Sequence, residues 1–134
     1  MSDKSTPPPE LVILNVDDKP ESLYAKDRLL RLAGYTVANA TTGKVALDLA
    51  YRLRPQLILL DVHLPDIDGR EVCRRMKEHP ELKSIPVILV SATLRGHAQN
   101  LDGLRWSNAD GYLGEPFEPE ALESTVRRAL KSAV

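Results

Sequence analysis

Short aliphatic runs alternate with longer segments of helical period along the chain. Three of these runs, residues 11–16, 57–60 and 87–90, are aliphatic almost throughout. Such runs are typical of parallel strands that helices cover on both faces. Two shorter and more mixed runs, residues 36–40 and 111–113, are predicted to be the flanking strands.

Four segments between and after these runs have the apolar spacing of helices, and they cover residues 20–33, 45–53, 69–79 and 118–131. Pro20 in a first turn and Gly34 just beyond the last turn are the residues expected at the ends of a helix. The second helix must end before Pro55, and Asp68 can cap the third. A weaker helix is predicted over residues 95–106, where two glycines lower the helical propensity.

The alternation of strands and helices predicts an α/β fold with a parallel sheet and helices on both faces. The chain has 134 residues, which is enough for one domain with its own core. We expect this domain to span residues 10–134. Residues 1–9 are polar and rich in proline, and they are predicted to form a flexible N-terminal segment.

The composition indicates the cellular compartment, and it argues against membrane insertion and against direct binding to nucleic acid. Cys73 is the single cysteine, so no intramolecular disulfide can form, and no apolar run approaches the about 18 residues of a membrane span. These features predict a cytoplasmic protein without a membrane partner. The net charge of −1 provides no overall field for direct binding to nucleic acid. Only residues 132–134 follow the last helix, so we expect a stand-alone domain or one domain of a longer protein.

Polar side chains follow the predicted strands where each strand ends, and they are Asp17, Asp18, Asp61, Ser91 and Glu115. The carboxyl ends of parallel strands meet at the edge where such sheets bind ligands, so these groups are expected to converge. Clustered carboxylates repel one another unless a cation lies among them, and their oxygens suit Mg²⁺. Beside a metal ion, Asp61 would act as a nucleophile toward a phosphoryl donor. Each residue taken alone would instead be a turn, cap or strand-end residue.

The motifs around these residues resemble those of response regulator receiver domains, the CheY-like superfamily of two-component signalling. They are Asn-Val-Asp-Asp-Lys-Pro at residues 15–20, Leu-Asp-Val-His-Leu-Pro-Asp-Ile-Asp-Gly at 60–69, Val-Ser-Ala at 90–92 and Ala-Asp-Gly-Tyr-Leu at 109–113. The resemblance extends over residues 11–130. It implies a flavodoxin-like, doubly wound sheet of five strands in the order 2-1-3-4-5.

The resemblance also implies a role for each residue at the strand ends. Asp61 would be the phosphoacceptor. Magnesium would be held by Asp17, Asp18, Asp61 and the backbone carbonyl of His63. Ser91 would bond a phosphoryl oxygen. The chain would therefore be a phosphoprotein that modifies itself, and it would not be an enzyme that turns over a substrate.

The same resemblance implies partners and a switch. The phosphoryl donor would be a histidine kinase or a histidine phosphotransfer protein of a phosphorelay, and the parent protein could be a hybrid sensor histidine kinase. Tyr112 matches the aromatic residue whose rotamer changes on activation. The face from Arg95 to the last helix matches the usual surface for partners or for a homodimer.

One position departs from the family pattern. Receiver domains normally have a lysine before the proline that follows the last strand, and its ammonium group bonds the phosphoryl group, whereas this chain has Glu115. Replacing a cation by an anion removes attraction and adds repulsion, and one charge at about 5 Å is worth about 3 kcal/mol at an effective dielectric constant of about 20. Three outcomes are open: Glu115 turns into solvent and another cation such as Lys19 or Arg95 substitutes, Mg²⁺ binds but switching is impaired, or the domain is an unphosphorylated docking module. We favour the first two together.

The third predicted helix carries two further features that we expect to be structural. Cys73 is predicted to be a packed apolar group, since nothing near it in the sequence suggests an activated thiolate. Arg74, Arg75 and Lys77 are predicted to form a solvated face.

Overall fold

Five parallel strands form a single sheet in the order β2-β1-β3-β4-β5, in a computed structural model that describes residues 11–92 and 105–132. The strands are β1 (Val12–Val16), β2 (Thr36–Ala40), β3 (Leu57–Asp61), β4 (Val87–Ser91) and β5 (Gly111–Gly114). Every pair of neighbouring strands is parallel. The predicted strands and their predicted order are therefore confirmed.

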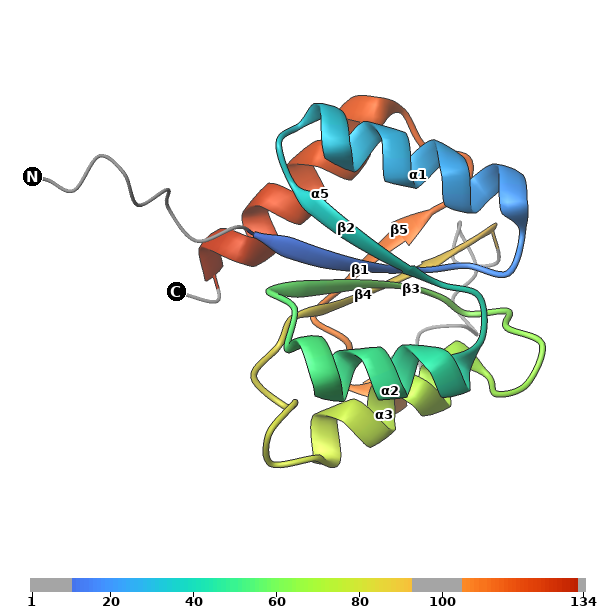
Figure 1. Ribbon diagram of the computed structural model, residues 1–134, viewed down its shortest axis with the longest axis vertical. Helices are drawn as coiled ribbons and strands as arrows, with labels where there is room; N and C mark the ends of the chain where they lie inside the picture. Colours follow the sequence, from blue (N-terminus) through green and yellow to red (C-terminus); the bar gives the residue numbers. More distant parts are fainter. Residues whose placement is uncertain (1–10, 93–104, 133–134) are drawn as a thin grey trace, which may run out of the picture.

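The helices cover both faces of this sheet, as Figure 1 shows, with α1 and α5 on one face and α2 and α3 on the other. Their bounds are α1 (Pro20–Leu32), α2 (Gly43–Leu53), α3 (Gly69–Glu78) and α5 (Pro119–Ser132). The carboxylate of Asp68 accepts a hydrogen bond of 2.8 Å from the N–H of Arg70, which confirms the predicted cap of α3. Most of the weak helix predicted over residues 95–106 lies outside the described residues, and residues 105–107 are helical. None of the described helices is long and apolar enough to span a bilayer.

Two apolar layers, one on each face of the sheet, form the core. Leu57 and Leu59 of β3 point into the layer beneath α1 and α5, whereas Ile58 and Leu60 point into the layer beneath α2 and α3. All five residues of β3 are buried, as are all five of β4, which explains why their sequences are aliphatic without alternation. Cys73 is fully buried in the second layer, as predicted.

The basic residues predicted to form a solvated face of α3 differ in their exposure. Arg74 and Arg75 both form ion pairs with Glu71 of the same helix and keep contact with solvent. The prediction of a solvated face is wrong for Lys77, whose side chain is only 9% exposed. Its aliphatic stem is covered by the protein, and its ammonium group is paired within the fold.

Asp110, just before β5, is the partner of Lys77. Its Oδ2 atom lies 2.5 Å from the Nζ of Lys77, and the same oxygen accepts a hydrogen bond of 2.8 Å from the N–H of Val87. The Asp110 N–H donates in turn to the carbonyl of Val87 at 2.8 Å, and Lys77 also donates to the carbonyl of Ile85 at 2.7 Å. The amino end of β5 is thus fixed to both α3 and β4.

Candidate metal and phosphoacceptor site

Three carboxylates meet at the carboxyl edge of the sheet. Asp17 and Asp18 directly follow β1, and Asp61 is the last residue of β3, the strand beside β1. One oxygen of each carboxylate lies within 4.8 Å of the others. Asp17 is fully buried, Asp61 is 2% exposed, and Asp18 is open to solvent. The sequence-based expectation that these side chains converge therefore matches the geometry.

Both oxygens of Asp17 accept hydrogen bonds. The backbone N–H of Lys19 donates to Oδ1 at 3.0 Å, which closes a turn that leads into α1. The ammonium group of Lys26 donates to Oδ2 at 2.7 Å. Lys26 is only 1% exposed, and a lysine is rarely buried so deeply unless it is paired. Asp17 is thus fixed by its own turn and by a buried cation.

Lys26 was not predicted to be a site residue, although its position in the sequence indicates that it is buried. It follows Leu23 by three residues and precedes Leu30 by four, so it falls on the apolar stripe of α1. A lysine on a buried stripe, close in sequence to two aspartates, indicates an internal ion pair.

Asp61 has a cationic neighbour as well. The Nζ of Lys19 lies 3.3 Å from the Oδ2 of Asp61 and 3.8 Å from the Oδ1 of Asp17, on a side chain that is 52% exposed. Burial raises the pKa of Asp61, and the negative charge of Asp17 raises it further. Lys19 and Lys26 oppose this rise. The carboxylate of Asp61 therefore lies in surroundings that disfavour its charge, and two nearby cations offset part of this effect.

The loop after Asp61 is fixed by a glycine and an aspartate. A Cβ atom at Gly69 would lie 2.1 Å from the carbonyl oxygen of Asp61, so only glycine allows α3 to start this close to β3. The carboxylate of Asp66 accepts hydrogen bonds from the N–H groups of Gly43 and Lys44, at 2.8 and 2.9 Å. These two bonds are the main cause of a lowered pKa of Asp66. Both residues belong to the motif over residues 60–69, and both hold its backbone in place.

The other predicted site residues belong to the ends of neighbouring strands. Ser91 is buried at the end of β4, and the N–H of Glu115 donates to its carbonyl at 3.2 Å. Among the described carboxylates, the cluster contains three of the four that we expected, and Glu115 is not one of them. Glu115 follows β5, which is two strands away from β3. His63 is exposed two residues after Asp61, and Arg95 lies outside the described residues.

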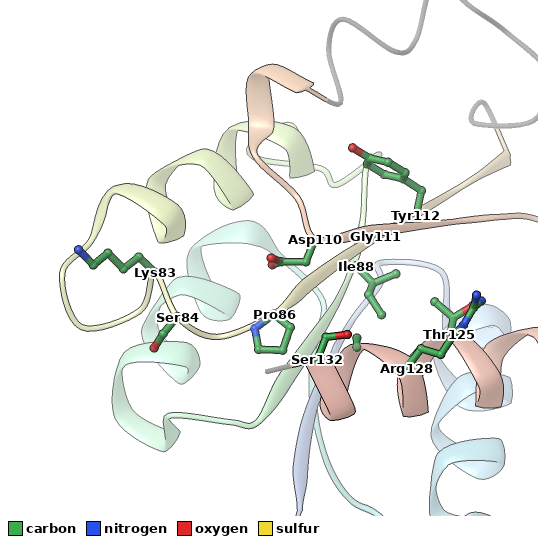
Figure 2. A pocket seen from close by; sticks show the side chains of 11 residues that line it. Lys83, Ser84, Pro86, Ile88, Asp110, Gly111, Tyr112, Thr125, Arg128 and Ser132 are labelled. Atoms are coloured by element: carbon green, nitrogen blue, oxygen red, sulfur yellow. The ribbon is translucent and has the colours of Figure 1, made fainter. Parts of the chain in front are cut away.

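Tyr112 lies on β5, which β4 separates from β3 and Asp61. Its side chain is 43% exposed and lines a cleft that Thr125 and Arg128 of α5 also line (Figure 2). Asp110 lines the same cleft. The tyrosine is thus accessible on the face formed by β5 and α5.

Residues 13–127, most of the chain, match the response regulator receiver domain family. The chain belongs to this family. It is 36% identical over 121 residues to RpaA of Synechocystis, a DNA-binding dual master transcriptional regulator, and the match covers 89% of this chain. The receiver domain spans about half of that relative, 48% of its length.

Solved structures agree with this assignment. A protein described as a response regulator of Chloroflexus aurantiacus is 33% identical, with a TM-score of 0.86 over 92% of this chain and 99% of the other. The receiver domain of a sensor histidine kinase of Pseudomonas aeruginosa is 27% identical, with a TM-score of 0.82 over 92% and 99%. That structure holds a magnesium ion in its active site cleft. The predicted family and the predicted CheY-like, flavodoxin-like fold are both confirmed.

Proposed function

We propose that this receiver domain accepts a phosphoryl group on Asp61 in a Mg²⁺-dependent reaction. The observation that carries the proposal is the convergence of one oxygen each from Asp17, Asp18 and Asp61 within 4.8 Å. The donor is a histidine kinase or a histidine phosphotransfer protein, as in the two-component systems to which the family belongs. The domain is a phosphoacceptor and does not turn over a separate substrate.

The donor set fits a hard divalent cation. Asp17, Asp18 and Asp61 would hold Mg²⁺ with the carbonyl of His63, because Mg²⁺ prefers oxygen ligands and keeps several waters. Each carboxylate oxygen of Asp17 accepts one hydrogen bond from a lysine and has a further lone pair. Exposed Asp18 leaves one side of the cluster open to water and phosphate. A bound Mg²⁺ would neutralise negative charge on the transferred phosphoryl group.

The phosphoryl transfer itself requires little of the protein beyond position and charge. An oxygen of Asp61 attacks phosphorus, a new O–P bond forms, and the N–P bond of the donor phosphohistidine breaks. The electron pair of that bond stays on the imidazole nitrogen. The Nζ of Lys19 lies 3.3 Å from Asp61, and its half-exposed side chain can turn to pair with the arriving phosphoryl group. Ser91 then bonds a phosphoryl oxygen.

The output of the reaction is a changed partner surface. We assign this surface to the face formed by β5 and α5, where Tyr112 is exposed beside a cleft. A downstream protein or a second copy of the domain binds there. In this proposal the domain acts in the cytoplasm and contacts neither nucleic acid nor a membrane directly.

Intact mass measurement after incubation with acetyl phosphate tests this function. With Mg²⁺ the chain should gain the mass of one phosphoryl group, and with EDTA it should gain none. Asp61→Asn should abolish the gain. Asp27→Asn, which changes a carboxylate on α1 that is paired with Arg31, is the matched control and should leave the gain intact. A phosphoryl group on the Asp61→Asn variant would refute the assignment.

Glu115 favours a second candidate, an unphosphorylated docking module. The residue places a carboxylate where receiver domains normally have a lysine, and an additional negative charge opposes an incoming phosphate. The Glu115→Lys variant separates the two functions in the same mass measurement. If only this variant gains the phosphoryl group, the natural chain is a docking module.

A further inference from the structure

Lys26 is the most deeply buried cation among the described residues, and its surroundings give it one charged partner. The residue is 1% exposed, and its Nζ lies 2.7 Å from the Oδ2 of Asp17. A buried lysine loses the hydration of its ammonium group. The ion pair with a nearby carboxylate must offset this desolvation cost. A position on the apolar stripe of α1 would otherwise be filled by a leucine or a methionine.

The charge of Lys26 also reaches Asp61. The Nζ of Lys26 lies 2.7 Å from the Oδ2 of Asp17, and an oxygen of Asp17 lies within 4.8 Å of an oxygen of Asp61. Lys19 contributes too, but its side chain is 52% exposed and can leave. Lys26 has no such freedom, because protein atoms surround its stem. Glu115, at the end of β5, supplies no positive charge.

We propose that Lys26 is the resident cation of this site, and that it balances the acidic cluster from α1 in place of a cation at residue 115. It holds Asp17 through the hydrogen bond to Oδ2 and gives the site a fixed positive charge near Asp61. This makes it a positioning residue for phosphoryl transfer, acting through Asp17. The inference rests on the proposed function. It adds that the positive charge of Lys26 compensates for the negative charge of Glu115 in phosphoryl transfer.

A fixed cation has two effects that a structural lysine would not have. It repels Mg²⁺ and attracts the phosphoryl group. Removing its charge should therefore tighten Mg²⁺ binding and slow phosphorylation, each by about tenfold or more, because the same charge acts on both. A general loosening of the site would weaken both properties together.

The test compares Lys26→Met, Lys26→Gln and the double variant Lys26→Met/Glu115→Lys with the natural chain. Mg²⁺ affinity is measured by calorimetry, and the rate of phosphorylation by acetyl phosphate is measured by intact mass. Lys26→Gln keeps a donor for Asp17 without the charge, and it replaces Lys26→Met in the comparison if that variant does not fold. Lys131→Met, which removes an exposed lysine at the end of α5, is the control for loss of one positive charge.

The proposal expects opposite changes in affinity and rate for both single variants, no change for Lys131→Met, and recovery of the rate in the double variant. It is overturned if Mg²⁺ affinity and rate fall together, or if a lysine at position 115 does not restore the rate. If the natural chain is not phosphorylated at all, the proposed function fails. The role of Lys26 is then decided by Mg²⁺ affinity alone, which must still rise in Lys26→Gln.

Discussion

Replacing Asp61 by asparagine should stabilise the domain in the absence of metal. The nearest oxygens of Asp17 and Asp61 lie within 4.8 Å, and two negative charges at that distance repel by about 3.5 kcal/mol at an effective dielectric constant of about 20. Lys19 offsets about 1 kcal/mol or less of this, because its side chain is half exposed and screened. Lys26 offsets a further part. We therefore expect Asp61→Asn to raise the free energy of unfolding by about 1–2 kcal/mol.

The gain in stability from Asp61→Asn should decrease as the pH falls. The pKa of Asp61 in the fold is raised above its ordinary value of 3.8, so the folded state binds this proton more tightly than the unfolded state does. The ionised carboxylate therefore destabilises the fold above its folded pKa. The advantage of the asparagine should be complete there and should vanish as the pH falls toward 3.8.

Urea unfolding in EDTA, followed by tryptophan fluorescence over a range of pH, measures this advantage. Asp27→Asn is the control and should show no gain, since it loses an ion pair with Arg31. Adding Mg²⁺ should stabilise the natural chain more than Asp61→Asn, because a ligand that binds only the folded state stabilises it by mass action. The reasoning is refuted if Asp61→Asn is the less stable protein in EDTA at neutral pH, or if its advantage does not change with pH.

Two further predictions concern residues packed beside the site and within the core. Gly69→Ala should lower the free energy of unfolding by about 3 kcal/mol or more and weaken Mg²⁺ binding, since its Cβ would lie 2.1 Å from the carbonyl oxygen of Asp61. Gly111→Ala, whose Cβ would meet Ile88 at an ordinary 3.6 Å, is the matched control, and equal stability of the two variants would contradict the prediction. Burial raises the pKa of the Cys73 thiol to about 12, so at neutral pH it should react with iodoacetamide only after denaturation. Modification of the folded protein at the rate of a free thiol would count against this.

The strands and most helices could be predicted because their determinants are local. A run such as residues 57–60 must be buried on both faces wherever it lies in the fold, and a parallel sheet is the arrangement that covers it. The proximity of the carboxylates at the ends of β1 and β3 could be predicted from the sequence, because both strands end at the same edge of the sheet. The cluster thus follows from strand ends and strand order alone.

The errors concern long side chains, whose position depends on partners far away in the sequence. Lys77 was expected in solvent, because nothing near it in sequence reveals Asp110, its partner 33 positions away. Lys26 was overlooked for a similar reason, although its spacing from Leu30 places it on the buried side of α1. Glu115 was expected to converge with the other strand-end carboxylates, and it is not one of the three that cluster among the described residues. In the fold, β4 lies between it and Asp61.

The anchoring of Asp110 has a consequence for how β5 can respond to events at the site. Three bonds to α3 and β4 pin this strand at its entry, through Lys77 and through both backbone groups of Val87. At its exit, the backbone bond from Glu115 to Ser91 is longer, at 3.2 Å. Because β5 is anchored more firmly at its entry than at its exit, we expect any displacement that starts near Asp61 to be larger at Glu115 than at Asp110. Amide hydrogen exchange along β5, with and without a phosphoryl group, would measure this difference.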